Sequence, residues 1–366
     1  MQYDLILEGK NEFYPNLNKK KYNICLVNSK EKINFMIKFF NNFIDNQNKH
    51  VNKKHFIGCD FEFNRVQKTQ REVALFQINL ETDSDIGTLF VFNPPELNNE
   101  HNKVLIKLLT NNKIIKILHG GESLDIPYLF DQVLVTDENI NNFCKNLYDT
   151  KYLCEYNHIE SNSDNKKCSI YYLLVENKII TKQKFIDLEK IEEKMGPIYL
   201  IQINIHTMSD ALFRYSLYDV LFLPELVKTF LKKSTVYTKL IPEISTIIFK
   251  YKRLENHEIN KIKKIVYSYN NNFIKSDDNY YLLNEIYNYY LLSITNKTFN
   301  NLIQITYFKE FLEICLKYIV YKHVSNFQNI YQTKSVIAPE IENFNFNKYP
   351  NLNKLISELL KEIRKY

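Results

Sequence analysis

Hydrophobic residues follow two spacings in the first half of the chain, and each spacing predicts one kind of element. Alternating or short apolar runs predict β-strands. These runs cover residues 23–29, 56–64, 73–80, 87–93 and 113–118. Apolar residues three or four positions apart predict a helix after Asn28, which is a plausible cap with Glu31 three residues later. The same spacing predicts helices over residues 102–109 and 124–130.

The order of these elements favours a mixed sheet covered by helices. The strands at 56–64, 73–80 and 87–93 suit an antiparallel meander, and a helical crossover would place the strand at 113–118 alongside. From about Cys168 onward the pattern is mostly helical. The first twenty residues are polar and are expected to be irregular. A chain of 366 residues is long enough for about two domains.

Composition narrows the class of protein without deciding it. The 48 basic and 42 acidic residues give a net charge of +6, which mildly favours an anionic partner such as nucleic acid. The six cysteines include no CxxC pair, so neither a zinc site nor a disulfide framework is indicated. This cysteine usage leads us to expect an intracellular, reduced protein. Residues 1–7 also lack the basic start and apolar run of a secretion signal. No apolar stretch is long enough to predict a membrane span.

Two acids stand out in the stretch "FIGCDFEFN" at residues 56–64. Asp60 and Glu62 are two positions apart, so both carboxylates of a strand would point to the same face. Like charges side by side on one sheet face repel each other. An isolated pair of this kind is usually a solvated feature of an edge strand, and further acids are needed before chemistry is inferred.

Asp125 and Asp219 supply those further acids. Asp125 follows an apolar strand and a Gly-Gly turn, where a helix cap next to Pro127 is an equally good interpretation. Asp219 lies among apolar residues on a predicted helix, with Tyr215 one turn earlier. An exposed polar stripe is the plainer explanation. If the carboxylate is buried instead, it needs a partner, and a metal ion is the strongest one.

Four carboxylates together could surround two divalent cations. Hard cations such as Mg²⁺ prefer oxygen ligands, and two ions about 3.5–4 Å apart clamp both oxygens of a phosphodiester displacement. Tyr215 could orient the attacking water through a hydrogen bond. The pattern therefore predicts a metal-dependent phosphodiester hydrolase.

At this point the motifs resemble those of the DEDD 3′–5′ exonuclease superfamily. "DFE" at 60–62, Asp125 after "ILHGG", and "YxxxD" at 215–219 occur in that family's order, with similar intervening segments. The ribonuclease D-like branch, with tyrosine in the third motif, is the closest match. Arg214 stands where the sister branch has a histidine. The resemblance covers about residues 22–232.

The resemblance implies a ribonuclease H-like α/β fold, with a mixed β-sheet flanked by helices. The sequence pattern predicts an N-terminal extension (1–21) and a mostly α-helical C-terminal region of unknown role (244–366). The resemblance covers the exonuclease domain (22–232). It also implies two Mg²⁺ or Mn²⁺ ions and a nucleic acid substrate with a single-stranded or frayed 3′ end. Asp60 would bridge both ions, Glu62 and Asp219 would complete one site, Asp125 would serve the second, and Tyr215 would orient the water.

Several alternatives stay open. The stretch from His119 to Asp125 is one residue longer than the family's pattern, so Glu122 competes with Asp125 as the second-motif acid. A catalytically inactive nucleic-acid-binding or scaffold protein, or an endonuclease, could use the same fold. The sequence does not distinguish RNA from DNA as substrate. His119 and Asp149 are expected to be structural, and Gln77 is expected to be a sheet-surface residue.

Basic and aromatic clusters carry less weight. Lysine and arginine pairs are candidate phosphate contacts, although most such clusters are solvated helix faces. They lie at Lys53-Lys54, Lys182/Lys184, Lys252-Arg253 and Lys261/Lys263/Lys264. Tyrosines of the last third could stack on bases. Their helical spacing more often indicates core positions.

Overall fold

The computed structural model describes most of the first 250 residues and a short stretch near residue 300. The described residues are 2–6, 21–49, 54–67, 70–82, 86–163, 167–250, 289, 292 and 295–308. The chain divides into two compact units, Met1–Lys252 and Arg253–Tyr366. Of the second unit, the structure describes a short helix, α12 (Lys297–Leu302), and a few residues around it. There Tyr289 packs its ring against Phe299 and Phe308, the contacts of a core tyrosine.

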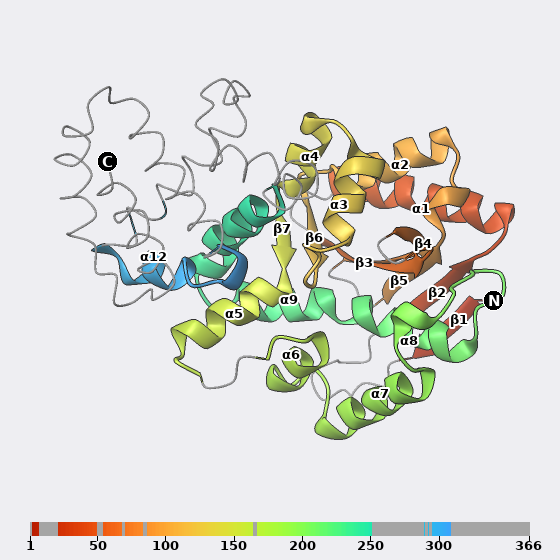
Figure 1. Ribbon diagram of the computed structural model, residues 1–366. Helices are drawn as coiled ribbons and strands as arrows, with labels where there is room; N and C mark the ends of the chain where they lie inside the picture. The colour runs from red at the N-terminus through yellow and green to blue at the C-terminus, as the bar shows by residue number, and fades with distance from the viewer. Residues whose placement is uncertain are drawn as a thin grey trace, which may run out of the picture. The chain divides into compact units, whose positions relative to one another are not determined.

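The first unit is built on a seven-stranded sheet with the order β1-β2-β5-β4-β3-β6-β7 (Figure 1). The strands are β1 (Gln2–Ile6), β2 (Lys21–Val27), β3 (His55–Arg65), β4 (Arg71–Glu81), β5 (Ile86–Phe92), β6 (Ile114–Leu118) and β7 (Leu147–Asp149). β3, β4 and β5 form the predicted antiparallel meander. β6 lies parallel to β3 after the crossover helix α2 (Asn99–Leu109). The ribonuclease H-like mixed sheet flanked by helices is thereby confirmed.

Two details at the N-terminal side differ from the sequence predictions. The extension expected to be irregular contributes β1, which pairs antiparallel with β2. Such a five-residue strand at a sheet edge has too short a pattern to be recognised before its partner is known. Helix α1 (Lys30–Lys49) begins one residue later than predicted, because the Ser29 hydroxyl accepts from the Lys32 N–H. The Asn28 side chain instead accepts from the Lys32 ammonium group.

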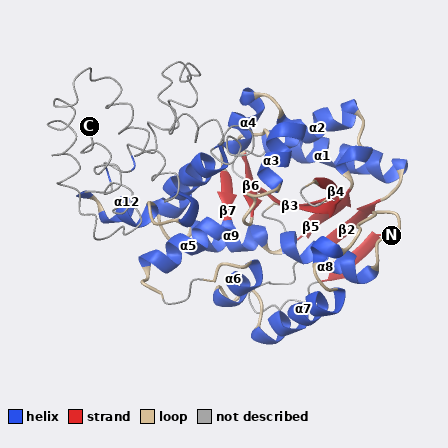
Figure 2. Ribbon diagram, in the orientation of Figure 1, coloured by secondary structure: helices blue, strands red, loops and turns tan. Residues whose placement is uncertain are grey.

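Helices cover both faces of the sheet, as Figure 2 shows. The remaining elements are η1 (Pro94–Glu96), α3 (Asp125–Tyr128), the π-helical η2 (Leu129–Leu134), α4 (Asp137–Cys144), α5 (Thr150–Glu160), α6 (Ile170–Glu176), α7 (Lys182–Met195), η3 (Ile198–Leu200), α8 (Asp210–Leu221), α9 (Leu223–Leu231) and η4 (Val236–Leu240). No helix among the described residues is long and apolar enough to cross a membrane.

Aromatic side chains hold one face of the meander together. The ring of Phe61 stacks on that of Phe76, with centroids 4.1 Å apart. Phe76 contacts Phe92, and Phe40 of α1 packs edge-on against Phe92. Since Phe61 points toward this apolar layer, its neighbours Asp60 and Glu62 must point to the other face of β3.

The other face of the meander receives the junction between α8 and α9. A Cβ atom added at Gly58 would lie 3.0 Å from the Val220 carbonyl oxygen and 3.3 Å from the Cβ of Leu223. The last carbonyls of α8 find donors on the sheet. Asn79 donates to Val220 and Leu221 at 3.3 and 3.0 Å, and the Tyr22 hydroxyl donates to Leu221 at 3.2 Å. These bonds satisfy groups that a helix end leaves unpaired.

The close approach at Gly58 leads to a first prediction. Gly58→Ala should lower the free energy of unfolding by about 1–3 kcal/mol because the added methyl group meets Val220 and Leu223. Gly58→Val should lower it further. Urea unfolding followed by circular dichroism measures both. Strand propensity alone would give the opposite sign, since alanine and valine both favour a strand more than glycine does. An increase in stability would therefore contradict the packing argument.

Candidate metal centre

Three of the predicted acids come together in the structure. Asp60 and Glu62 lie on β3 and Asp219 lies on α8, and one carboxylate oxygen of each is within 4.8 Å of the other two. Glu62 is buried, and Asp60 and Asp219 are half-buried. The arrangement has the size and ligand type of a metal site.

Local strand geometry sets the direction of the two acids on β3. A β-bulge between Glu62 and Phe63 shifts the register with β4 immediately after the pair. Bulges of this kind re-aim side chains and are common beside active sites. Gln77 of β4 lies directly opposite Asp60, and the structure buries it completely. Both polar atoms of its side chain lack a hydrogen-bond partner within the described part of the chain. The expected sheet-surface glutamine is therefore a buried polar group beside the acids.

Asp125 lies next to this group without joining the set of three. It is the first residue of α3, and a Cβ atom added at Gly121 would lie 3.4 Å from its Oδ2 atom. The charges of Asp60 and Asp219 both act on its carboxyl group. Asp149 shapes the preceding turn by accepting from the N–H groups of Gly120 and Gly121 at 2.9 and 3.1 Å.

Glu122, the competing acid, is engaged elsewhere. Its carboxylate is 2 % exposed and lies 2.5 Å from the Lys151 ammonium group. Its second oxygen accepts from the Tyr152 hydroxyl at 3.2 Å. These partners neutralise and orient the carboxylate, so Glu122 has the contacts of a structural residue.

Burial dominates the electrostatics of the acidic group. Desolvation raises the pKa of Asp60 to about 7. The pKa values of Glu62 and Asp219 are raised well above their ordinary range, first by burial and then by the charges of neighbouring carboxylates. The pKa of Asp125 is raised for the same two reasons. Raised pKa values mean that the carboxyl groups favour their protonated, neutral forms. A bound divalent cation would lower these pKa values by favouring the charged forms.

Tyr215 lies one helical turn before Asp219 and is half-buried. Burial, followed by the charge of Asp219, raises the pKa of its phenol. The hydroxyl therefore stays protonated at neutral pH and can donate a hydrogen bond. Tyr171 of α6 and Glu192 of α7 form a hydrogen-bonded pair nearby, and the charge of Glu192 acts on Asp219. This pair could not be predicted from the sequence, because α7 has the pattern of an ordinary charged surface helix.

A second contact that the sequence did not reveal lies at the end of β3. Asn64 accepts from the Ile203 N–H at 2.7 Å and donates to the Ile203 carbonyl at 2.8 Å. These two bonds fix the segment after η3 against the strand that carries Asp60 and Glu62. Ile203 is itself buried. Ile203 therefore packs beside the end of β3, two residues beyond Glu62.

His119 lies between β6 and the Gly120-Gly121 turn. Its Nδ1 atom lies 2.8 Å from the Thr150 hydroxyl, which itself donates to the Leu118 carbonyl. Burial, together with the charge of Lys151, lowers the pKa of His119 to about 4. The ring is neutral and satisfied, as expected of a structural histidine.

Lys184, one of the candidate phosphate contacts, already has a partner within the protein. Its ammonium group lies 3.0 Å from the Tyr218 hydroxyl and above the Tyr218 ring.

Comparison with known proteins shows the family of this chain. No family model matches it. The uncharacterized protein L533 of Acanthamoeba polyphaga mimivirus is 31% identical over 352 residues, covering 85% of this chain and 67% of that protein. The chain belongs to the same family as this mimivirus protein.

Three solved structures show partial similarity to this chain. The Nibbler EXO domain of Aedes aegypti is 16% identical and covers 63% of this chain and 95% of its own, with a TM-score of 0.39. Brucella melitensis NrnC bound to pGG is 15% identical and covers 61% of this chain and 90% of its own, with a TM-score of 0.36. The catalytic core of RRP6 from Trypanosoma brucei is 14% identical and covers 96% of this chain and 83% of its own, with a TM-score of 0.40.

The different contacts of Asp125 and Glu122 lead to a second prediction. Mg²⁺ or Mn²⁺ should raise the melting temperature of the wild type, because a cation offsets the repulsion among buried carboxylates. Asp125→Asn and Asp60→Asn should reduce this metal-induced increase. Glu122→Gln should keep the increase, although its own melting temperature in chelator should be lower because Lys151 loses its charged partner. Differential scanning calorimetry with metal and with chelator measures both quantities. The opposite ranking of the Glu122 and Asp125 variants would assign the second acid to Glu122.

Proposed function

We propose that this protein is a metal-dependent 3′–5′ exonuclease of the DEDD superfamily, of the branch with tyrosine in the third motif. The observation that carries the proposal is the cluster of Asp60, Glu62 and Asp219, with oxygen atoms within 4.8 Å of one another. The sequence motifs place the same three residues in that family's order. A protein that only bound nucleic acid would have no reason to bury clustered negative charge where phosphates must approach.

The donor set suits Mg²⁺ or Mn²⁺. All three side chains offer carboxylate oxygens, the ligands that hard divalent cations prefer. Asp60 is the candidate to bridge two ions, Glu62 and Asp219 would complete one site, and Asp125 would serve the other. When bound, two such ions lower the pKa of a coordinated water and neutralise the leaving 3′-oxygen.

The protein's own groups would orient the reactants. Tyr215 keeps its phenolic proton and can donate a hydrogen bond to the attacking water, which fixes the direction of attack. The Gln77 amide lies beside Asp60 with polar atoms that lack a partner among the described residues. This amide can donate a hydrogen bond to a carboxylate oxygen, or bind a water molecule, at the same site. Both roles concern positioning, so their removal should slow the reaction without abolishing it.

The substrate proposed is a nucleic acid with a single-stranded or frayed 3′ end, because stepwise removal requires a free terminal phosphodiester at the acids. The net charge of +6 favours such a polyanion. Discrimination between RNA and DNA depends on contacts to the 2′-hydroxyl. The first experiment therefore compares matched RNA and DNA oligonucleotides.

The third prediction tests the acids directly. Asp60→Ala and Asp219→Ala should abolish hydrolysis of a labelled RNA or DNA oligonucleotide, because each removes a metal ligand. Asp45→Ala, which changes an exposed acid on α1, should match the wild type. The wild type should release mononucleotides from the 3′ end with Mg²⁺ or Mn²⁺, spare circular substrates, and stop in chelator. Cleavage of circles would indicate an endonuclease. Metal-independent binding without turnover would indicate an inactive nucleic-acid-binding protein.

The fourth prediction concerns Tyr215. Tyr215→Phe should reduce kcat about ten- to hundred-fold, because the water loses a positioning bond while the carboxylates remain. Its metal-induced rise in melting temperature should equal that of the wild type. Tyr218→Phe is the matched control, since it removes a hydroxyl three residues later on α8 that bonds Lys184. Equal rates for Tyr215→Phe and the wild type would remove the water-orienting role.

A further inference from the structure

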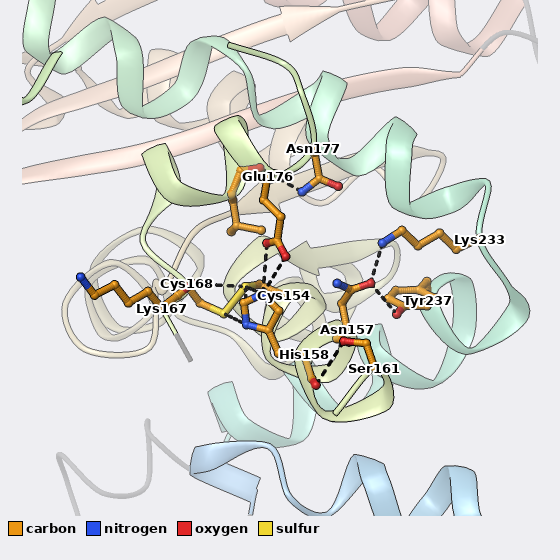
Figure 3. A network of polar contacts seen from close by, with 11 residues as sticks. Cys154, Asn157, His158, Ser161, Lys167, Cys168, Glu176, Asn177, Lys233 and Tyr237 are labelled. Carbon is orange, nitrogen blue, oxygen red and sulfur yellow. Dashed lines mark hydrogen bonds and ion pairs between the residues drawn. A yellow bond between two sulfur atoms is a disulfide. The ribbon is translucent and has the colours of Figure 1, made fainter. Parts of the chain in front are cut away.

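A second cluster of metal-binding side chains lies on α5 and just before α6 (Figure 3). Cys154 and His158 are four residues apart on α5 and therefore share one helix face. Cys168 lies two residues before α6, and the structure joins it to Cys154 in a disulfide. This corrects the interpretation of the sequence, in which the cysteines indicated no disulfide framework. The fourteen-residue separation gives no motif, and the fold supplies the proximity.

The position of His158 is not explained by a disulfide alone. Its Nδ1 atom lies 3.7 Å from the Sγ atom of Cys154 and 3.7 Å from that of Cys168. A tetrahedral zinc ion with Zn–S bonds of about 2.3 Å and Zn–N bonds of about 2.0–2.1 Å separates its sulfur and nitrogen ligands by about 3.6 Å. The imidazole therefore stands at the distance from both sulfur atoms that a shared zinc ion requires.

The other ring nitrogen has the partner that metal-binding histidines use. His158 Nε2 lies 3.0 Å from each carboxylate oxygen of Glu176, at the end of α6 (Figure 3). The Cys154 sulfur lies 3.7 Å from Nδ1 and 3.8 Å from Nε2. When Nε2 carries the ring proton it donates to Glu176, and Nδ1 is then the unprotonated nitrogen that can bind a metal ion. A carboxylate behind a ligating imidazole fixes its tautomer and raises its basicity. His158 is only 5 % exposed, so this orientation is held by packing.

The helix that bears these ligands is anchored on its other side. The Asn157 side chain accepts from the Lys233 ammonium group at 2.6 Å and from the Tyr237 hydroxyl at 3.3 Å (Figure 3). Tyr237 also donates to Glu160 at 2.9 Å. These bonds tie α5 to the region of α9 and η4, so the backbone that carries Cys154 and His158 is fixed before any ion binds.

We propose that Cys154, His158 and Cys168 form a zinc site when the two cysteines are reduced. Two thiolates and one imidazole suit zinc, whereas the candidate metal centre offers oxygen atoms alone. Cys168 is half-buried, so water can reach the fourth coordination position from its side. The bound ion would fasten α6 to α5. Through α6 it would hold Tyr171, which hydrogen-bonds Glu192 beside Asp219.

Conversion between the two states balances as a thiol–disulfide exchange. A dithiol reductant transfers two electrons and two protons, the Cys154–Cys168 bond breaks, and the reductant becomes a disulfide. Zinc binding then displaces the two thiol protons to solvent, because the thiolate is the ligand. The sulfur atoms must separate to about 3.8 Å for tetrahedral coordination.

The fifth prediction tests the proposed zinc site on the full chain. Saturating Mg²⁺ is present throughout, so that the carboxylates of the candidate metal centre are occupied and do not bind the added ions. After reduction with a phosphine, titration with Cd²⁺ should produce a thiolate-to-metal charge-transfer band that saturates at one Cd²⁺ ion per protein. Zn²⁺ should abolish this band by competing for the same thiolates. Zn²⁺ should also raise the melting temperature of the reduced protein and leave that of the oxidised protein unchanged. These readouts do not depend on nuclease activity.

Variants distinguish the ligands from their surroundings. Cys154→Ser, Cys168→Ser and His158→Gln should each weaken Zn²⁺ binding, and the two cysteine variants should reduce the charge-transfer band. Cys25→Ser, which changes a half-buried free cysteine on β2, should bind like the wild type. Glu176→Gln should weaken binding about ten- to hundred-fold, while Glu100→Gln at an exposed ion pair should not.

Two results would overturn the proposal. The first is a reduced wild type that shows no thiolate–metal band. The second is equal Zn²⁺ binding by the oxidised protein, or by a Cys154→Ser/Cys168→Ser double variant whose circular dichroism matches the wild type. Either would make the pair a structural disulfide only.

Discussion

The packing of the end of α8 onto β3 is the contact on which the acidic cluster depends. Asp219 lies one residue before Val220, whose carbonyl oxygen lies 3.0 Å from the position that a Cβ atom would take at Gly58 and accepts from Asn79. Asp60 lies two residues after Gly58 on the same strand face. A helix end that approached the sheet less closely would leave the acids too far apart to share an ion. The missing side chain at Gly58 and the amide at Asn79 therefore decide whether the distant Asp219 joins Asp60 and Glu62 in one site.

This packing works against electrostatics. Bringing Asp60, Glu62 and Asp219 within 4.8 Å removes water from like charges, and the raised pKa values of all three report that cost. The opposite face of β3 shows what offsets it. Phe61 stacks on Phe76 within a continuous aromatic layer, so the strand is held by apolar burial on one side while it carries acids on the other. The stability of the sheet sustains an arrangement that the acids alone would not form.

The parts of the structure that the sequence predicted are those with a local cause. The alternation in 56–64 and 73–80 requires strands, and the period of two places Asp60 beside Glu62. The approach of Asp219 has no local cause, and only the resemblance to a nuclease family suggested it. Sequence spacing left Glu122 and Asp125 as alternatives, because the contacts that distinguish them come from Lys151 and Tyr152 on another element. The disulfide of Cys154 was missed for the same reason, since tertiary packing brings its partner.

Helix α5 connects the two candidate sites. At its start, the Asp149 carboxylate accepts from Gly120 and Gly121 and so shapes the turn that leads to Asp125. Two turns later the same helix presents Cys154 and His158. His119 links these ends, because its ring lies against Thr150 and hydrogen-bonds the backbone of Cys168. A change in how Cys168 is held, by a disulfide or by an ion, therefore acts on a histidine directly beside the turn that positions an acid of the candidate metal centre.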